Sequence, residues 1–283
     1  MMNKVKHFFK KYFKKKLIIK KGKFGIKYLI VPNSALDYHI LKNGIYEEWI
    51  THNLNDLIPK NGVIFDVGAN VGLLSLVFAK NHVPNGFVYA FEPDPENFIQ
   101  FEKNIKINNL NNIKIFPIAI QNNNQTIQTK FNIRRAIDGD GNENRGLSSL
   151  ISFPIHKISE EIVLASTIDN EFFKNQIKRI DFLKIDVEGS EYNVLLGGKE
   201  SIKKLQPIIQ YEYSNILDKM INANNAKNCF YFLEKLEYKQ FAIINEQHLR
   251  ELKKDNSEMQ DVNIICFPKN KINLLTKKLF YYE

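Results

Sequence analysis

The sequence has 283 residues, of which 44% are hydrophobic, so it is long and apolar enough for one large folded domain with extensions. This composition excludes a disordered chain. The two cysteines, Cys229 and Cys266, are far apart and have no histidine or cysteine at metal-ligand spacing. They therefore exclude a disulfide framework or a zinc ribbon and favour a reducing compartment, with both residues in the core.

Positive charge is concentrated at the N-terminus. The formal net charge is +9, and residues 1–23 contain ten lysines and no acid, so the rest of the chain is close to neutral. Aromatic and aliphatic residues alternate with these lysines, and a helix here would have an apolar side and a cationic side. We expect an amphipathic arm that contacts anionic membrane, with nucleic acid as the second choice and a solvated extension as the alternative.

The arm does not read as a targeting signal. Its uncharged runs, such as Leu17-Ile18-Ile19, are shorter than the apolar region of a signal peptide. No part of the chain offers the roughly 18 apolar residues that a membrane span needs. The predicted location is the cytoplasm, with peripheral contact at the inner membrane face.

From Val63 onward, short runs rich in β-branched and aromatic residues alternate with longer amphipathic stretches. This rhythm predicts a parallel sheet with helices on both faces. Helices are expected after the first strand, through Leu73 to Phe78, and again over about 94–107. Strands are expected over 63–67, 87–91 and 113–120.

Residues 121–160 interrupt this rhythm and are predicted to form a mobile insertion. A strand is expected over 126–133, followed by a polar, glycine-punctuated loop over 138–144. The loop resembles half of a calcium-binding loop, but it has no acid at the far end of the twelve-residue frame, so no metal site is assigned. His156 stands alone and is interpreted as a surface residue.

The alternation resumes near Ile180. Expected elements are a strand over 180–185, a helix over 190–204, a strand over 207–213, a helix over 226–236, and a closing antiparallel pair over 240–244 and 262–267. The predicted organisation is an arm and lead-in over residues 1–43, a folded domain over 44–268 and a tail over 269–283.

The turn after the first strand has the sequence Asp66-Val67-Gly68-Ala69-Asn70-Val71-Gly72. Glycines at this place let the backbone approach a ligand at the carboxyl end of the strands. The segment matches neither the dinucleotide fingerprint nor the Walker loop. An acid at its head would repel phosphate but suits an ammonium group, so S-adenosylmethionine is favoured over NAD or ATP.

Carboxylates follow three other predicted strands. Glu92 ends the second strand, 20 positions after Gly72, where a carboxylate can accept hydrogen bonds from two ribose hydroxyls. Asp186, Glu188 and Glu191 cluster around Gly189, where they predict a general base or a cation site, with helix capping as the alternative, above all for Glu191. Glu212 ends the next strand, and we expect it to contact substrate.

Together these motifs resemble the FkbM family of S-adenosylmethionine-dependent methyltransferases. The resemblance covers roughly residues 40–267, and the order of its segments is more specific than any one of them. The matching segments are Gly44–Glu47, Phe65–Gly72, Ala90–Pro93, Gly146–Leu150, Ile185–Glu191 and Tyr211–Glu212.

The resemblance implies an α/β class I methyltransferase fold, with a mostly parallel seven-stranded sheet whose last strand is antiparallel. It also implies methyl transfer, usually to a hydroxyl, on a small natural product or a sugar of a surface glycan. By this likeness the methionine end of the cofactor lies at Asp66, Gly68, Asn70 and Gly72, its ribose at Glu92, and Glu47 and Ser149 belong to the same site. The family fixes no base, so the catalytic candidates Asp186, Glu188 and Glu212 are our own interpretation.

The sequence also permits three other functions, each of which has a feature against it. A nucleic-acid methyltransferase is suggested by the basic arm but disfavoured by the near-neutral body and by Ile185-Asp186-Val187-Glu188 in place of an Asn-Pro-Pro-Tyr signature. A nicotinamide-dependent oxidoreductase lacks its glycine fingerprint. A non-catalytic membrane-binding module would not need acids at three strand ends.

Overall fold

The computed structural model describes residues 17–30, 40, 42–123, 126–134, 136–137, 143–144, 148–151, 157–244, 248–253 and 261–275. Its main sheet has eight strands within these residues. Their order is β14 (His248–Leu252), β13 (Tyr238–Ile244), β15 (Val262–Pro268), β12 (Ile208–Tyr213), β11 (Phe182–Ile185), β3 (Val63–Val67), β4 (Phe87–Phe91) and β5 (Ile113–Phe116).

The direction of the strands confirms the predicted fold class. Strands β12, β11, β3, β4 and β5 are parallel to one another, and β15 runs antiparallel to both β12 and β13. The strand count differs from the prediction because β14 pairs with β13 at the edge of the sheet and adds an eighth strand. Its sequence, His-Leu-Arg-Glu-Leu, is too polar to be recognised as a strand.

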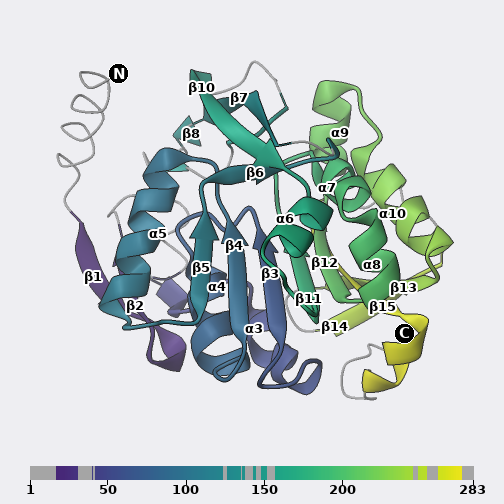
Figure 1. The fold of residues 1–283 in the computed structure, drawn as a ribbon, viewed down its shortest axis with the longest axis horizontal. Helices are drawn as coiled ribbons and strands as arrows, with labels where there is room; N and C mark the ends of the chain where they lie inside the picture. Colours follow the sequence, from purple (N-terminus) through teal and green to yellow (C-terminus); the bar gives the residue numbers. More distant parts are fainter. Residues whose placement is uncertain are drawn as a thin grey trace.

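Helices cover both faces of the sheet (Figure 1). Leu183, Ile185 and Tyr211 pack with the helices of one face, and Ile64, Phe182 and Ile208 pack on the other. The first face carries α6 (Ile168–Lys174), α7 (Glu191–Gly197), α8 (Lys199–Leu205) and α10 (Asn225–Lys235). The second carries α3 (Glu48–Asn53), α4 (Leu73–Val77) and α5 (Pro95–Ile107).

Proline 117 divides the strand that was expected over 113–120. It has no backbone N–H to donate, and the chain leaves the main sheet there. Residues Ile113–Phe116 remain in β5, whereas β6 (Ile118–Ile120) joins a second sheet with β10 (Lys157–Ser166) and β7 (Ile127–Arg134). This small sheet lies above the carboxyl ends of β3, β4 and β5 (Figure 1).

The small sheet is built from the predicted insertion. Strand β7 confirms the strand expected over 126–133, and it pairs antiparallel with β10. Within the polar loop, β8 (Ala136–Ile137) pairs with β9 (Glu143–Asn144). Residues 138–142 of that loop, together with Gly146 and His156, lie outside the described residues.

The N-terminal arm is not helical over its described part. Strand β1 (Ile18–Lys21) pairs with β2 (Lys27–Ile30), separated by the short helix η1 (Lys23–Gly25), so the expected helix is wrong for these residues. This hairpin lies beside α5 (Figure 1). The preceding residues 1–16 lie outside the described part of the chain.

The remaining elements refine the predictions. The single helix expected over 190–204 is two helices, α7 and α8, which meet at Gly198. Helix α9 (Asn215–Ile221) and the short helices η2 (Leu54–Asp56), η3 (Phe78–His82) and η4 (Lys269–Leu274) complete the described structure. Both cysteines are unpaired and buried. Among the described residues, no helix has the length and apolar character required to cross a membrane.

Candidate functional site

The Asp66–Gly72 turn follows β3 at the carboxyl edge of the parallel strands. Gly68 has a φ of +82°, and a Cβ atom there would overlap the carbonyl oxygen of Asp186. Gly72 has a φ of +84°, and its Cβ atom would overlap the ring of Phe101. Both glycines are therefore needed for the backbone path and for close packing.

Glu92 is anchored by the backbone of that turn. Its Oε2 accepts a hydrogen bond from the Asn70 N–H at 2.7 Å, and its Oε1 accepts one from the Asp94 N–H at 2.8 Å. The residue is 5% exposed and lines a cavity above the sheet. A buried carboxylate that lines a cavity is suited to accepting hydrogen bonds from a ligand with adjacent hydroxyls.

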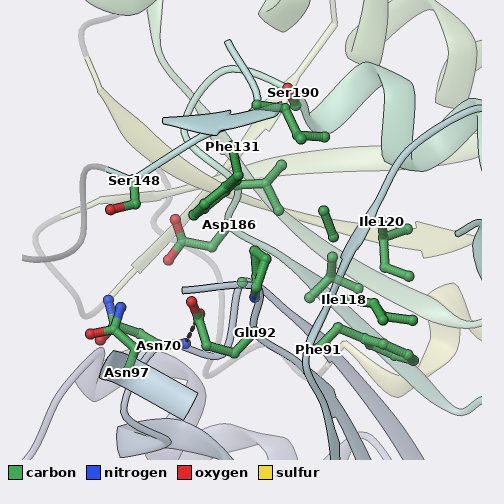
Figure 2. A pocket seen from close by; sticks show the side chains of 16 residues that line it. Asn70, Phe91, Glu92, Asn97, Ile118, Ile120, Phe131, Ser148, Asp186 and Ser190 are labelled. Atoms are coloured by element: carbon green, nitrogen blue, oxygen red, sulfur yellow. Dashed lines mark hydrogen bonds between the residues drawn. The ribbon is translucent and has the colours of Figure 1, made fainter. Parts of the chain in front are cut away.

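This first cavity has one polar and one apolar side. Figure 2 shows the carboxylates of Glu92 and Asp186 pointing into the same space, with Ile118 and Ile120 across from them. Such a cavity can hold a flat apolar ring on one side and a ribose on the other. Its lining comprises Val67, Gly68, Asn70, Phe91, Glu92, Pro93, Asn97, Ile118, Ala119, Ile120, Phe131, Ser148, Leu150, Asp186, Val187 and Ser190.

A second cavity adjoins the first, because Gly68, Asn70 and Asp186 line both. It is much more polar and lies on the α3 and α4 side of the sheet. Its lining comprises Tyr46, Glu47, Asp66, Gly68, Ala69, Asn70, Leu73, Leu74, Lys184, Asp186, Glu188, Glu212 and Asn263.

A buried lysine organises this second cavity. Lys184 on β11 is paired in register with Asp66 on β3 and Gln210 on β12, so the three side chains share one face of the sheet. The Lys184 ammonium lies 2.8 Å from Asp186 Oδ2 and 3.4 Å from Glu47 Oε1, with its side chain 4% exposed. Although burial lowers it, these carboxylates raise the pKa of Lys184 well above its ordinary value.

Glu47 and Asp66 are also held by hydrogen bonds. Glu47 lies just before α3 and accepts from the side-chain amide of Gln210. Asp66 accepts from the hydroxyl of Ser75, and burial raises the pKa of the Asp66 carboxyl. The structure thus places Glu47 beside Lys184 in the second cavity, whereas the family resemblance implies a place for it in the cofactor site.

The three predicted catalytic acids come together. Oxygens of Asp186, Glu188 and Glu212 lie within 4.8 Å of one another. Burial, followed by repulsion from Asp186 and Glu188, raises the pKa of Glu212 to about 10. Glu212 therefore holds a proton at neutral pH, whereas Asp186 pairs with the ammonium of Lys184.

Glu191 and Ser149 hydrogen-bond to backbone groups beside the site. Glu191 stands in the first turn of α7 and accepts from the N–H groups of Val187 and Gly189 at 3.1 and 3.2 Å, which is the local structural role that the sequence left open as the alternative. Ser149 donates to the Glu188 carbonyl at 2.8 Å and does not line the first cavity. Ser148 lines it in place of the predicted Ser149, so the serine assignment moves by one position.

Sequence reasoning missed several residues of the site. Lys184 carried one signal, a lysine between apolar residues within a short strand, where an unpaired charge would be costly. Three apolar residues of the cavity wall could not be recognised, because residues that line a cavity follow the same apolar pattern as residues that pack in a strand core. They are Ile118, Ile120 and Phe131.

Comparison with known proteins agrees with this geometry. The family described as "Methyltransferase FkbM domain" matches residues 66–257. "Methyltransferase 1" of Beauveria bassiana is 26% identical over 155 residues, which are 49% of this chain and 59% of that protein. "2-O-methyltransferase NoeI" of Sinorhizobium fredii is 29% identical over 163 residues, which are 54% of this chain and 63% of that protein.

A solved structure and the extent of these matches complete the comparison. The crystal structure of methyltransferase FkbM from Methylobacillus flagellatus is 15% identical with a TM-score of 0.47, over 75% of this chain and 45% of that one. The chain thus spans about 60% of the length of the two curated relatives named above.

Proposed function

Because this chain belongs to the FkbM family of methyltransferases, whose methyl donor is S-adenosylmethionine, we propose that it methylates a hydroxyl group of a sugar or a small natural product. The predicted enzyme class and cofactor agree with this family. The acceptor class is the new part of the proposal. It is supported by the 2-O-methyltransferase among the relatives and by the carboxylates beside the cofactor site.

One observation carries the proposal: the two cavities adjoin, because Gly68, Asn70 and Asp186 line both. The Glu92 carboxylate lines the first cavity and is suited to both ribose hydroxyls, and Ile118 and Ile120 offer an apolar wall for adenine. The second cavity holds acids suited to an ammonium group. The residues present therefore fit S-adenosylmethionine, which supplies an activated methyl group when bound.

Asp186 is the candidate base because of its place. It lines both cavities, and its Oδ2 lies 2.8 Å from the ammonium of Lys184. A base at this junction can take the proton of an acceptor hydroxyl while the oxygen attacks the methyl carbon. Glu212, which holds a proton, is suited to donating a hydrogen bond to the acceptor.

The cofactor assignment is tested by calorimetric titration of the full chain with S-adenosylhomocysteine. Glu92→Ala removes a charged partner of two hydroxyls and is expected to weaken binding about 100-fold. Glu251→Ala removes an acid from the exposed ion pair with Lys239 and should bind like the wild type. NAD is titrated in parallel.

Binding that Glu92→Ala does not alter would contradict the ribose assignment, and binding of NAD alone would overturn the cofactor. Thermal unfolding of each variant separates lost binding from lost folding. Once a hydroxyl acceptor is found, Asp186→Asn should lower turnover at saturating donor by about 100-fold. Unchanged turnover would remove Asp186 from the role of base.

A further inference from the structure

The β1–β2 hairpin, residues 18–30, precedes the residues that match the family, yet it packs against the Asp66–Gly72 turn. One buried apolar cluster contains residues of both segments. Its members from the hairpin and the turn are Ile26, Tyr28, Ile30, Ala69 and Val71. Because buried groups are closely packed, the hairpin is placed where it can influence the conformation of the turn.

A single side chain of α5 joins the two segments by hydrogen bonds. Asn104 is fully buried, and its Oδ1 accepts from the Leu29 N–H of β2 at 2.6 Å, while its Nδ2 donates to the Val71 carbonyl of the turn at 2.9 Å. The Leu29 N–H requires the amide oxygen as its partner, so it directs the amino group of Asn104 at Val71. Strand β2 thus orients the side chain that holds the turn.

Val71 occupies the most constrained part of the turn. It lies between Asn70 and Gly72, whose φ values are +52° and +84°. A left-handed conformation at Asn70 costs free energy and persists only where neighbouring groups hold it. The bond from Asn104 holds the peptide between Val71 and Gly72, because that peptide contains the Val71 carbonyl.

The same turn supplies a backbone group to the candidate ribose site. The Asn70 N–H donates to Glu92 Oε2 at 2.7 Å, and both residues line the first cavity. We propose that Asn104, which lines neither cavity, is a positioning residue that keeps the Asp66–Gly72 turn in the conformation that binds the cofactor. This inference rests on the proposed cofactor.

A turn that lacks this bond should bind the cofactor less tightly. Where the turn also adopts other conformations, only the competent fraction binds, and the apparent dissociation constant rises as that fraction falls. Loss of one hydrogen bond to a buried carbonyl is enough to lower the competent fraction about tenfold. Turnover at saturating donor should change little, because the turn in the bound state is the same.

Calorimetric titration of the full chain with S-adenosylhomocysteine tests this role. Asn104→Leu keeps the approximate shape of the side chain and removes both hydrogen bonds, so the dissociation constant should rise about tenfold. Thermal unfolding of the variant shows whether it is folded at the temperature of the titration.

Two control variants remove bonds to the same strand. Asn108→Leu is the same exchange just after α5, and it removes the bonds to the N–H and carbonyl groups of Lys27. Gln100→Met removes a buried bond, since Nε2 of Gln100 donates to the Leu29 carbonyl at 2.7 Å. Each should alter the dissociation constant less than about twofold, because the bond from Asn104 to Val71 is kept.

Steady-state kinetics give a second readout once a hydroxyl acceptor is found. Asn104→Leu should raise the KM for S-adenosylmethionine about tenfold and leave kcat within about twofold of the wild-type value. A loss of stability alone would have the opposite pattern, because it lowers the amount of folded enzyme and therefore kcat, at an unchanged KM.

Amide hydrogen exchange on the wild-type chain tests the same coupling without a variant. Saturating S-adenosylhomocysteine should slow exchange at the Leu29 N–H, because a ligand that holds the turn also holds, through Asn104, the strand bonded to it. Strand β14, at the edge of the main sheet, lines neither cavity and is the internal reference for general stabilisation by the ligand.

The outcomes separate the two proposals. Wild-type affinity in a folded Asn104→Leu chain, or an equal loss of affinity in the two controls, would overturn the positioning role and leave the cofactor assignment intact. Protection at Leu29 no greater than in β14 would do the same. A failure of the wild-type chain to bind S-adenosylhomocysteine would overturn the cofactor assignment and the positioning role with it.

Discussion

Single residues in this site act through partners that lie both near and far in the sequence. Lys184 meets Glu47 and Asp186, and its strand neighbours Asp66 and Gln210 stand at the same level of the sheet. Glu191 is similar, since its carboxyl fixes the turn at Val187 and Gly189 and accepts from Asn225 on α10. These buried charges make the site sensitive to protonation.

Glu191 gives a prediction about pH. Burial raises the pKa of its carboxyl from 4.5 to about 7, so its contribution to stability is present below about pH 4.5 and is lost as the pH rises through 7. Glu191→Gln cannot ionise and should gain up to about 3 kcal/mol relative to wild type between pH 5 and pH 8. Urea unfolding at both pH values measures this change.

The matched control for that experiment is Glu251→Gln, which alters an exposed carboxylate beside Lys239. Its effect on the free energy of unfolding should be nearly the same at both pH values. A Glu191→Gln effect that is equally flat would show that the wild-type carboxyl titrates in the ordinary acidic range.

The acids predicted from the sequence fall where parallel strands end, because that edge is fixed by strand direction. The sequence alone therefore predicts that four acids lie close together, namely Asp66, Glu92, Asp186 and Glu212. The role of Lys184 could not be predicted, because its contacts depend on the pairing register of β11 with its neighbouring strands and on the position of Glu47 at the start of α3.

At the scale of elements, β2 is held against α5 by side-chain amides that hydrogen-bond to its backbone. Gln100 and Asn104 on α5 and Asn108 just after it are four residues apart and bond to the backbone of β2. Asn104 accepts from the Leu29 N–H at 2.6 Å and donates to the Val71 carbonyl at 2.9 Å. It thereby connects the hairpin, α5 and the Asp66–Gly72 turn.

Asn104→Ala should be costly because it removes the bonds to the partly buried Leu29 N–H and the buried Val71 carbonyl. The expected loss is about 3 kcal/mol in the free energy of unfolding, measured by urea denaturation. Asn108→Ala removes bonds to Lys27 that are exposed to water and should cost less than about 1 kcal/mol. Equal effects of the two changes would argue against the bridging role of Asn104.

The elements show where sequence patterns are informative. Alternation of apolar strands with amphipathic helices gave β3, β4, β11, β12 and α5 close to their observed bounds. The hairpin β1–β2 and the edge strand β14 were missed because each is short and rich in charge. Pro117 was the overlooked signal for the division between β5 and β6.

At the scale of the whole molecule, the hairpin β1–β2 lies beside α5 (Figure 1), whereas the residues that line the cavities cluster where the central parallel strands end. Contact with an anionic surface through residues 1–23 stays a prediction from the sequence.

That prediction can be measured with vesicles. Removal of residues 1–16 takes away seven lysines and should lower the partition onto phosphatidylserine-containing vesicles by more than about tenfold at moderate salt. Neutral phosphatidylcholine vesicles are the control and should bind both chains weakly. Equal binding of the two chains to acidic vesicles would remove the arm from this role, and tighter binding to duplex DNA would favour the alternative partner.

The position of β15 has a consequence for defining the minimal catalytic unit. Residues 66–257 identify the family, yet β15 begins at Val262 and pairs with both β12 and β13. A chain cut to those residues would separate β13 and β14 from the parallel strands and would also lose Glu47, the partner of Lys184. Expression boundaries for relatives should therefore be chosen by strand pairing, from before the Glu47 position to beyond β15, and not by the extent of sequence similarity.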